Sequence, residues 1–369
     1  MNFLQLTNYW WLIIWLFGAG FVLSQMNVKQ PEMVLGKREY RWRWGPAIAL
    51  VLPYIIWAGN RTIYMGDTAQ YMKMYQSFPD SIMQIGTYLA GSTKDKGFTV
   101  ISIIIKSIFG DSTFIFFMLF ATFQMLCMVR LFRKYSSSYW ISIFLFIAST
   151  DYVSWMMNGM RQFIAVTMIM ACFDWIVEKK YVPLICVILL ASTIHGSALL
   201  MLPIIFVIQG EAWNKKTILV IIATMIIIAY IDQFTPFLDS MLADTQYSDV
   251  ITNEIWTTDD GTNVIRVLVY SVPALLSFIG RKYVKAANNS VINVCVNCSI
   301  ITMALYLVAM VSSGIYVGRL PIYTTLPGYI ALPWLLDHMF TRESANIMRI
   351  LMIGAYLLVF YIQMFVVWG

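Results

Sequence analysis

The chain has 369 residues, of which 60% are hydrophobic and 12% are charged, and its mean hydropathy is +0.71. A soluble domain carries about a quarter charged residues, so this composition excludes an ordinary soluble protein. The formal net charge of +6 does not indicate nucleic acid binding, because the basic residues are spread over short loops between apolar stretches. The composition predicts an all-α polytopic membrane protein.

Apolar stretches of helical length recur along the whole chain. The first, 4–24, has no basic residue before it and no cleavage site of small residues, so we expect a retained span rather than a signal peptide. We expect about 10–13 transmembrane or re-entrant helices in a single membrane domain, 1–369. The stretches are 4–24, 45–58, 98–109, 112–129, 139–157, 160–177, 181–194, 196–208, 217–234, 263–280, 290–312, 320–337 and 347–368.

The basic residues predict which loops face the cytoplasm. The segment 29–44 carries Lys29, Lys37, Arg38, Arg41 and Arg43. The positive-inside rule therefore places this loop in the cytoplasm. The later basic clusters fall on the same side if two conditions hold. The stretch 98–109 must not cross by itself, and 181–208 must enter and return as a broken helix pair.

The break in that pair is expected at TIHGS (193–197), where Gly196 interrupts the helix. The basic clusters that then face inward are Arg130/Arg133/Lys134, Lys179/Lys180, Lys215/Lys216, Arg281/Lys282/Lys285 and Arg342/Arg349. On this topology two long loops, 59–97 and 235–262, lie outside. We expect them to form the extracellular face of the site.

Three arginines on the predicted outer side share one local context. Arg161 follows Asn-Gly at the start of an apolar stretch, Arg319 follows a glycine, and Arg266 lies one turn after Gly-Thr-Asn. Each would begin a span with backbone N–H groups and the positive end of the helix dipole on its own side, which favours phosphate binding. Together they could hold a pyrophosphate. Alternatively, each reaches lipid headgroups or pairs with a loop carboxylate such as Asp67 or Asp244.

His195 would lie at the apex of the broken helix pair. The near-neutral pKa of a histidine suits a general base that takes a proton from a sugar hydroxyl. The alternative is a histidine satisfied by hydrogen bonds with Thr193 or Ser197. Asp67 precedes a helical pattern, so it either caps that helix or holds an acceptor hydroxyl.

The predicted outer loops are rich in aromatic residues. These are Tyr64, Tyr71, Tyr75, Phe78, Tyr247 and Trp256. They could pack on sugar rings, or they could form the aromatic belt that is common at membrane interfaces.

The five cysteines all lie in apolar stretches and predict no disulfide framework. Cys295 and Cys298 form a CxxC without a second pair or a nearby histidine, which argues against a zinc site. The outer loops show no metal-ligand spacing, and the chain has no Walker, GxSxG, HExxH or Rossmann motif. We therefore expect neither a metal nor a cofactor, so the substrate must carry its own leaving group.

Four segments resemble, in order, the EpsG-like family of Wzy-type polysaccharide polymerases. The strongest parts of the resemblance are N-G-x-R-Q-x-x-A (158–165) and a later H-x-S (195–197) in a broken helix. The resemblance covers roughly 60–333. The segments are GDTAQYMKMYQSF (66–78), KGFTVISIIIKSIFG (96–110), 157–208 and GRLPIYTTLPGYIALP (318–333).

The resemblance implies an enzyme of the bacterial plasma membrane with a fold akin to the GT-C glycosyltransferases. It would polymerise undecaprenyl-pyrophosphate-linked repeat units of an exopolysaccharide or capsule on the outer face, without a metal. The expected partners are this lipid-linked oligosaccharide, membrane lipids, and a chain-length regulator and flippase of the same pathway. The predicted catalytic residues are His195, Arg161, Arg319 and Asp67. The predicted substrate-binding residues are Gln162, Arg266, Asn158 and Tyr71.

Two other functions would also use outward arginines. A flippase or transporter of lipid-linked oligosaccharides should show basic residues through the depth of the membrane and two matching halves, and the sequence has neither. Another lipid-phosphate-dependent glycosyltransferase or ligase would share the architecture.

Overall fold

The computed structural model of the chain describes residues 3–91, 94–231, 261–312, 314 and 317–367. It divides the chain into two compact units. Unit 1 comprises Met1–Leu199 with Phe340–Gly369, and unit 2 comprises Leu200–Met339. The expected single membrane domain over 1–369 stays a prediction.

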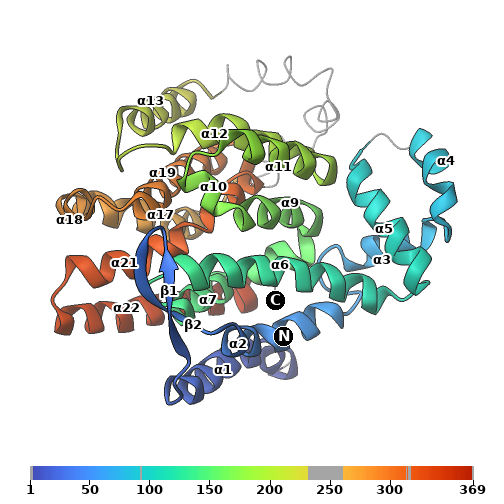
Figure 1. The fold of residues 1–369 in the computed structure, drawn as a ribbon, viewed down its shortest axis with the longest axis horizontal. Helices are drawn as coiled ribbons and strands as arrows, with labels where there is room; N and C mark the ends of the chain where they lie inside the picture. Colours follow the sequence, from blue (N-terminus) through green and yellow to red (C-terminus); the bar gives the residue numbers. More distant parts are fainter. Residues whose placement is uncertain (1–2, 92–93, 232–260, 313, 315–316, 368–369) are drawn as a thin grey trace. The chain divides into compact units, whose positions relative to one another are not determined.

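Unit 1 is built almost entirely from helices (Figure 1). Its regular elements are α1 (Phe3–Ser24), β1 (Lys29–Val34), β2 (Lys37–Trp42), α2 (Trp44–Gly59), α3 (Thr68–Ser77), η1 (Ile82–Gln84), α4 (Ile85–Ala90), α5 (Lys96–Phe109), α6 (Thr113–Tyr135), α7 (Tyr139–Ala148), α8 (Asp151–Val153), η2 (Ser154–Asn158), α9 (Met160–Ala171), α10 (Phe173–Val177), α11 (Tyr181–Ile194), α22 (Arg342–Tyr361) and η5 (Ile362–Val367). The long helix α6 packs against α2 and α9, and α9 packs against α11.

Unit 2 is organised around the buried helix α19 (Ser290–Met310), which packs against α17, α13 and α21. The short helix η3 (Gly196–Leu200) contains the sequence boundary between the two units. The other elements are α12 (Met201–Val207), α13 (Lys215–Ala229), α17 (Val264–Ile279), α18 (Arg281–Ala287), η4 (Val317–Arg319), α20 (Ile322–Thr325) and α21 (Gly328–Met339).

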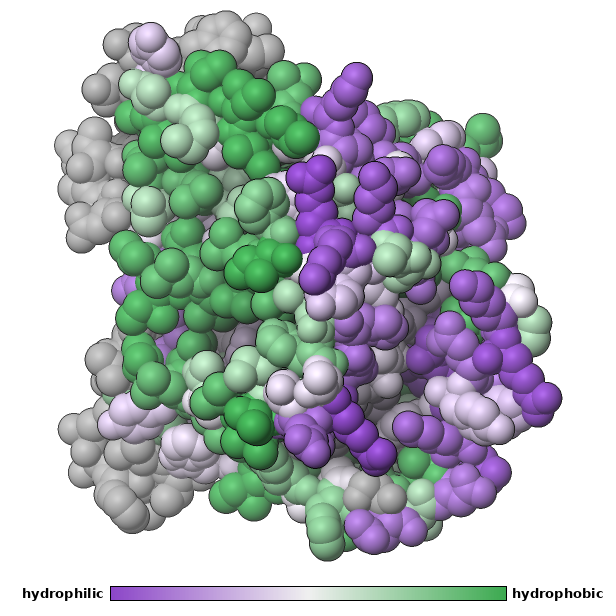
Figure 2. All heavy atoms as spheres, turned by 90° about the vertical axis from the view of Figure 1, so that its left-hand side faces the viewer, coloured by the Kyte–Doolittle hydropathy of each residue, from purple (hydrophilic) through white to green (hydrophobic). Residues whose placement is uncertain are grey.

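The predicted fold class is confirmed: the protein is an all-α polytopic membrane protein, 78% helical. Among the described residues, three helices are long and apolar enough to cross a membrane, or five if two bent pairs count as spans. Large apolar side chains such as Phe21, Leu190 and Leu219 are exposed, as expected where helices face lipid. Figure 2 shows hydrophobic residues gathered over one part of the visible face and hydrophilic residues over another.

The predicted apolar stretches coincide with helices, but some are interrupted. The stretch 139–157 is not one helix, because Thr150 adopts a left-handed backbone conformation (φ 68°) and the two halves bend by 70°. The stretch 160–177 is broken at Cys172. The segment 29–44, predicted as a cytoplasmic loop, forms an antiparallel hairpin in which Lys29 pairs with Trp42.

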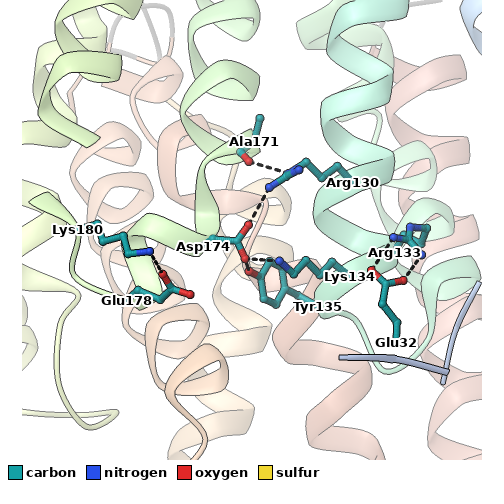
Figure 3. Close-up of polar contacts among 9 residues, drawn as sticks. All are labelled: Glu32, Arg130, Arg133, Lys134, Tyr135, Ala171, Asp174, Glu178 and Lys180. Carbon is teal, nitrogen blue, oxygen red and sulfur yellow. Dashed lines mark hydrogen bonds and ion pairs between the residues drawn. The ribbon is translucent and has the colours of Figure 1, made fainter. Parts of the chain in front are cut away.

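The basic clusters of unit 1 gather at one end, which we call the basic end. Arg133 donates to both carboxylate oxygens of Glu32 on β1, at 2.6 and 3.0 Å. Asp174 on α10 accepts hydrogen bonds from Arg130, Lys134 and Tyr135 of α6 (Figure 3). The basic cluster of α6 therefore joins the hairpin and α10 through two carboxylates, as expected if these segments face the same side.

The α9 end of unit 1 is where α2 ends, α9 begins and α11 ends. Helix α5 begins here, and its Phe98 ring stacks on Phe120 in the first half of α6, with centroids 5.3 Å apart. After α5, the carbonyl of Gly110 accepts a hydrogen bond from the Tyr75 hydroxyl on α3, at 2.7 Å. Helix α5 thus accompanies only the first half of α6 and does not reach the basic end. That 98–109 does not cross by itself stays a prediction.

We expect Gly97→Ala to destabilise unit 1. A Cβ at Gly97 would lie 2.1 Å from Thr193 Oγ1 and 3.0 Å from the Thr193 carbonyl carbon, so α5 and α11 would have to separate. Overpacking of this kind costs about 1–3 kcal/mol, which should lower the melting temperature in detergent by several degrees. The matched control is Gly45→Ala, also the second residue of its helix, with nothing within 4 Å of the new Cβ. Equal melting of both variants would contradict this packing.

Candidate functional site: a charged cavity at the start of α9

Helix α9 begins after a turn of π-helix. The backbone of Ser154–Asn158 widens so that the N–H of Gly159 donates to the carbonyl of Ser154, at 3.0 Å. Such π turns occur often at functional sites. Gly159 is the N-cap residue of α9 and has no side chain to cap the first turn. The N–H groups of that turn and the positive helix end therefore lie on the same side as Arg161.

Arg161 is held by a carboxylate that sequence reasoning did not name. Its Nη1 donates to Oδ2 of Asp95 at 2.5 Å, across 66 residues of sequence. The Asp95 side chain is 13% exposed and that of Arg161 is 36% exposed. Sequence analysis gave pairing with a loop carboxylate, such as Asp67 or Asp244, as the alternative to anion binding. Arg161 does pair with a carboxylate, but the partner is Asp95, and Asp244 lies outside the described residues.

The backbone of Asp95 is left-handed, with φ 50° and ψ 43°. This conformation is uncommon for residues other than glycine, although asparagine and aspartate adopt it more often than most, and it occurs often at functional sites. Asp95 stands at the N-cap position of α5, but within the described part of the chain its side chain makes no cap hydrogen bond. Burial raises the pKa of the Asp95 carboxyl, and the charges of Arg161 and Lys94 only partly oppose this rise.

Asp95 and Arg161 line a cavity of about 870 Å³. Lys94 adds a second cation to its wall. The volume lies within the range of pockets that enclose small ligands, about 300–1,000 Å³. Two cations and one carboxylate therefore face a space large enough for an anionic ligand.

Two predicted substrate-binding residues lie beside Arg161. The Tyr71 ring centroid lies 5.9 Å from the Arg161 guanidinium carbon, and the Tyr71 hydroxyl donates to the Asn158 carbonyl at 3.5 Å. Tyr71 is 6% exposed and belongs to the buried aromatic cluster that joins α3, α5 and α6. Its position orients the Arg161 guanidinium.

His195, Ser197 and Gln162 form a second polar group at the α9 end. His195 is the C-cap residue of α11, at the predicted break. Its Nδ1 lies 2.7 Å from Ser197 Oγ, and Gln162 Nε2 donates to the same oxygen at 3.3 Å. The bond to Ser197 is the one that sequence analysis gave as the alternative to a catalytic role. His195 and Gln162 are not among the residues that line the charged cavity.

Asp67 stands where the sequence predicted it, at the N-cap position of α3, half-buried. Its side chain makes no cap hydrogen bond with the described backbone of that helix. It does not line the charged cavity.

Arg61 also contacts the start of α9. It is 8% exposed and donates to the Met156 carbonyl in the π turn at 2.8 Å. It also contacts the Met160 sulfur and lies over the Phe117 ring, 3.8 Å from the centroid. Burial among these neutral groups lowers the pKa of Arg61 to about 10, so it remains charged at neutral pH.

The other two predicted arginines belong to unit 2 and lie at a common end of it. Arg266 is in the first turn of α17, 5.8 Å from the ring centroids of Tyr270 and Tyr306. Arg319 closes η4 and is exposed. Gly261 and Thr262 precede α17 and connect it to the end of α19, because the Thr262 N–H donates to the Ala309 carbonyl at 2.9 Å. The convergence of these arginines with Arg161 stays a prediction.

Some site residues escaped the sequence analysis. Asp95 was missed because nothing local connects it with Arg161, although its place between two lysines before an apolar run signals a helix start. The segment 59–97 was expected as an outer loop with one helical pattern after Asp67, but it contains α3, η1 and α4. Residues of this segment supply most of the cavity wall. The second expected outer loop, 235–262, lies outside the described residues except for Gly261 and Thr262.

The fold and this site define a polytopic membrane protein with a charged cavity at one end of a helical unit. The EpsG family model matches residues 46–368, so the chain belongs to the EpsG family. Family membership suggests a polysaccharide polymerase-like role and a glycosyltransferase-like enzyme. Neither the curated proteins nor the solved structures contain a match to the chain. The GT-C architecture therefore stays a prediction.

We expect Asp95→Asn to stabilise the protein at neutral pH. Because the pKa of Asp95 is raised in the folded state, its contribution to stability is present below the unfolded pKa of about 3.9 and is lost as the pH rises through the folded pKa. Asparagine carries no charge to bury and tolerates the left-handed backbone. The variant should melt above wild type at pH 7, and the difference should shrink towards pH 4.

The matched control is Asp67→Asn at the N-cap position of α3, which should leave the melting temperature nearly unchanged. A wild type that melts above Asp95→Asn at pH 7 would show that the attraction to Arg161 outweighs the burial of Asp95.

Proposed function

We propose that this protein polymerises lipid-linked glycan repeat units for an exopolysaccharide or capsule. The donor is a glycan carried on undecaprenyl pyrophosphate, and the acceptor is a sugar hydroxyl of a second lipid-linked chain. The single observation that carries the proposal is the cavity at the start of α9, where Arg161 and Lys94 face space beside an uncapped helix start.

The reaction is a displacement at the anomeric carbon of the donor. The acceptor oxygen forms the new glycosidic bond, the bond from carbon to phosphate oxygen breaks, and lipid pyrophosphate leaves with the electron pair. Arg161 neutralises the charge that grows on the leaving pyrophosphate, and we assign Arg319 to the same task from the sequence resemblance alone. His195 takes the proton from the acceptor hydroxyl, while Ser197, which accepts a hydrogen bond from Gln162, holds its ring.

Asp95 acts as a resident anion in this proposal. When no substrate is present, Asp95 pairs with Arg161 and neutralises its charge in a partly buried site. Incoming pyrophosphate displaces it, because two phosphates carry more negative charge than one carboxylate. Release of the product lets the pair form again.

The gathering of basic residues at the opposite end of unit 1 supports an outward-facing site. By the positive-inside rule the basic end faces the cytoplasm, so the start of α9 faces the other side of the bacterial plasma membrane. Repeat units would then reach the site after a flippase has moved them outward.

Loss of the leaving-group arginines should abolish polymerisation. With purified enzyme and lipid-linked repeat units, Arg161→Ala and Arg319→Ala should each lower kcat by about 10²–10³, the usual effect of removing one charge-stabilising donor. Wild type should keep its activity in excess chelator. The product ladder on a polyacrylamide gel is the readout.

The control is Arg38→Ala, which removes an exposed arginine from the hairpin at the basic end and should retain full activity. All variants should elute as folded protein on size exclusion. Full activity of Arg161→Ala or Arg319→Ala would rule out the leaving-group role. Movement of the lipid across vesicles without any glycan product would favour the transporter.

Removal of the resident anion should strengthen pyrophosphate binding. Asp95→Asn should bind undecaprenyl pyrophosphate several-fold to tenfold more tightly than wild type, because the lipid no longer competes with a carboxylate for Arg161. The gain should vanish when Arg161→Ala is added, since the two residues act as one unit. An equal gain in the presence and absence of Arg161 would argue against competition at this pair.

A further inference from the structure

The cavity that holds Arg161 has two chemically different walls. Lys94, Asp95 and Arg161 form the charged wall. The other wall is neutral and combines polar and aromatic side chains, chiefly Gln84, Thr87, Tyr88, Thr99 and Phe78. The proposed function uses the charged wall only, which leaves the neutral wall without a role.

The Tyr88 ring is presented to the cavity in a fixed orientation. It stands edge to face against Phe78, with centroids 5.7 Å apart and an interplanar angle of 80°. Phe78 is 5% exposed and belongs to the buried aromatic cluster, so it is a firm support. Tyr88 itself is half-buried. A rigid ring with accessible surface is suited to pack on an apolar face of a ligand.

The polar groups of this wall are neutral and diverse. Gln84 comes from η1, Thr87 from α4 and Thr99 from the first turn of α5. Together they offer an amide and two hydroxyl groups, which can both donate and accept hydrogen bonds. A phosphate would prefer the cations of the charged wall, Lys94 and Arg161. An isoprenoid chain would remove water from these groups without replacing their hydrogen bonds, which is unfavourable.

A sugar ring matches both properties. Its hydroxyl groups pair with neutral donors and acceptors, and its C–H faces pack on an aromatic ring, whose face carries partial negative charge. The sugar next to the pyrophosphate is joined to it by a single linkage. A ligand with its phosphates at Arg161 and Lys94 therefore has its first sugar in the same cavity, and 870 Å³ accommodates both.

We propose that the neutral wall, with Tyr88 as its stacking residue, binds the sugar attached directly to the pyrophosphate and so selects the first sugar of the repeat unit. This inference rests on the proposed function, because it takes the charged wall as the pyrophosphate site. Tyr88 and Gln84 are then specificity-determining residues, distinct from the groups that stabilise the leaving group.

Binding of defined lipids tests the proposal. The probes are undecaprenyl pyrophosphate itself and undecaprenyl pyrophosphate carrying glucose, galactose, N-acetylglucosamine or N-acetylgalactosamine, measured with the full-length protein in detergent. Wild type should bind at least one sugar-bearing lipid about tenfold more tightly than the bare lipid. Tyr88→Ala should remove this preference and leave the affinity for the bare lipid unchanged. Tyr88→Phe should retain most of the preference.

Further variants separate the two walls. Gln84→Ala should lower the affinity for the sugar-bearing lipid only, by a few-fold, whereas Arg161→Ala should lower the affinity for every lipid to the same extent. Met83→Ala is the matched control, because Met83 lies in η1 next to Gln84, is 92% exposed and does not line the cavity. It should behave as wild type with every probe.

Each contrary outcome has a distinct meaning. Wild type that binds the bare lipid through Arg161 but shows no sugar preference would overturn the sugar subsite and leave the proposed function standing. A Tyr88→Ala variant that keeps the preference would overturn it too. Equal weakening of the bare lipid by Tyr88→Ala would assign the wall to the isoprenoid chain instead. Wild type that binds none of the lipids would overturn the proposed function itself.

Discussion

The pair formed by Arg161 and Asp95 connects the parts on which the candidate site depends. It joins the first turn of α9 to the residue before α5 and closes one side of the cavity. A partly buried guanidinium needs an anion, and a carboxylate so little exposed needs a cation. Each therefore fixes the other, and Arg61 and Tyr71 secure the helix start around them. A ligand anion can take the place of Asp95 without leaving Arg161 unpaired.

The site also separates charge from neutral recognition. Cations gather at the helix start, where the α9 dipole adds to their field, while α4 and its neighbours present hydroxyl, amide and aromatic groups. A glycan joined to a pyrophosphate has this same division along its length. Under the proposed function, one cavity would hold a constant leaving group and discriminate between variable sugars, because the two tasks fall to different residues.

Sequence reasoning could name candidate residues that lie together in short segments. Arg161, Gln162 and His195 lie in compact motifs, and the structure joins Gln162 to His195 through Ser197. It did not find Asp95, because that contact spans 66 residues and depends on how α5 packs on α11. It also did not predict α4 within 59–97, because a helix of six residues is too short to show a clear helical periodicity.

Sequence by itself determined that this is a helical membrane protein, where most of its long apolar helices lie, and that basic clusters of unit 1 collect at one end. These properties follow from hydropathy and charge, which act over short segments of the chain. Only the tertiary structure decided that Thr150 bends a predicted span, that Asp95 is the partner of Arg161, and that Tyr88 faces the same cavity. Those outcomes depend on packing between distant segments, and no local periodicity encodes which side chains will meet.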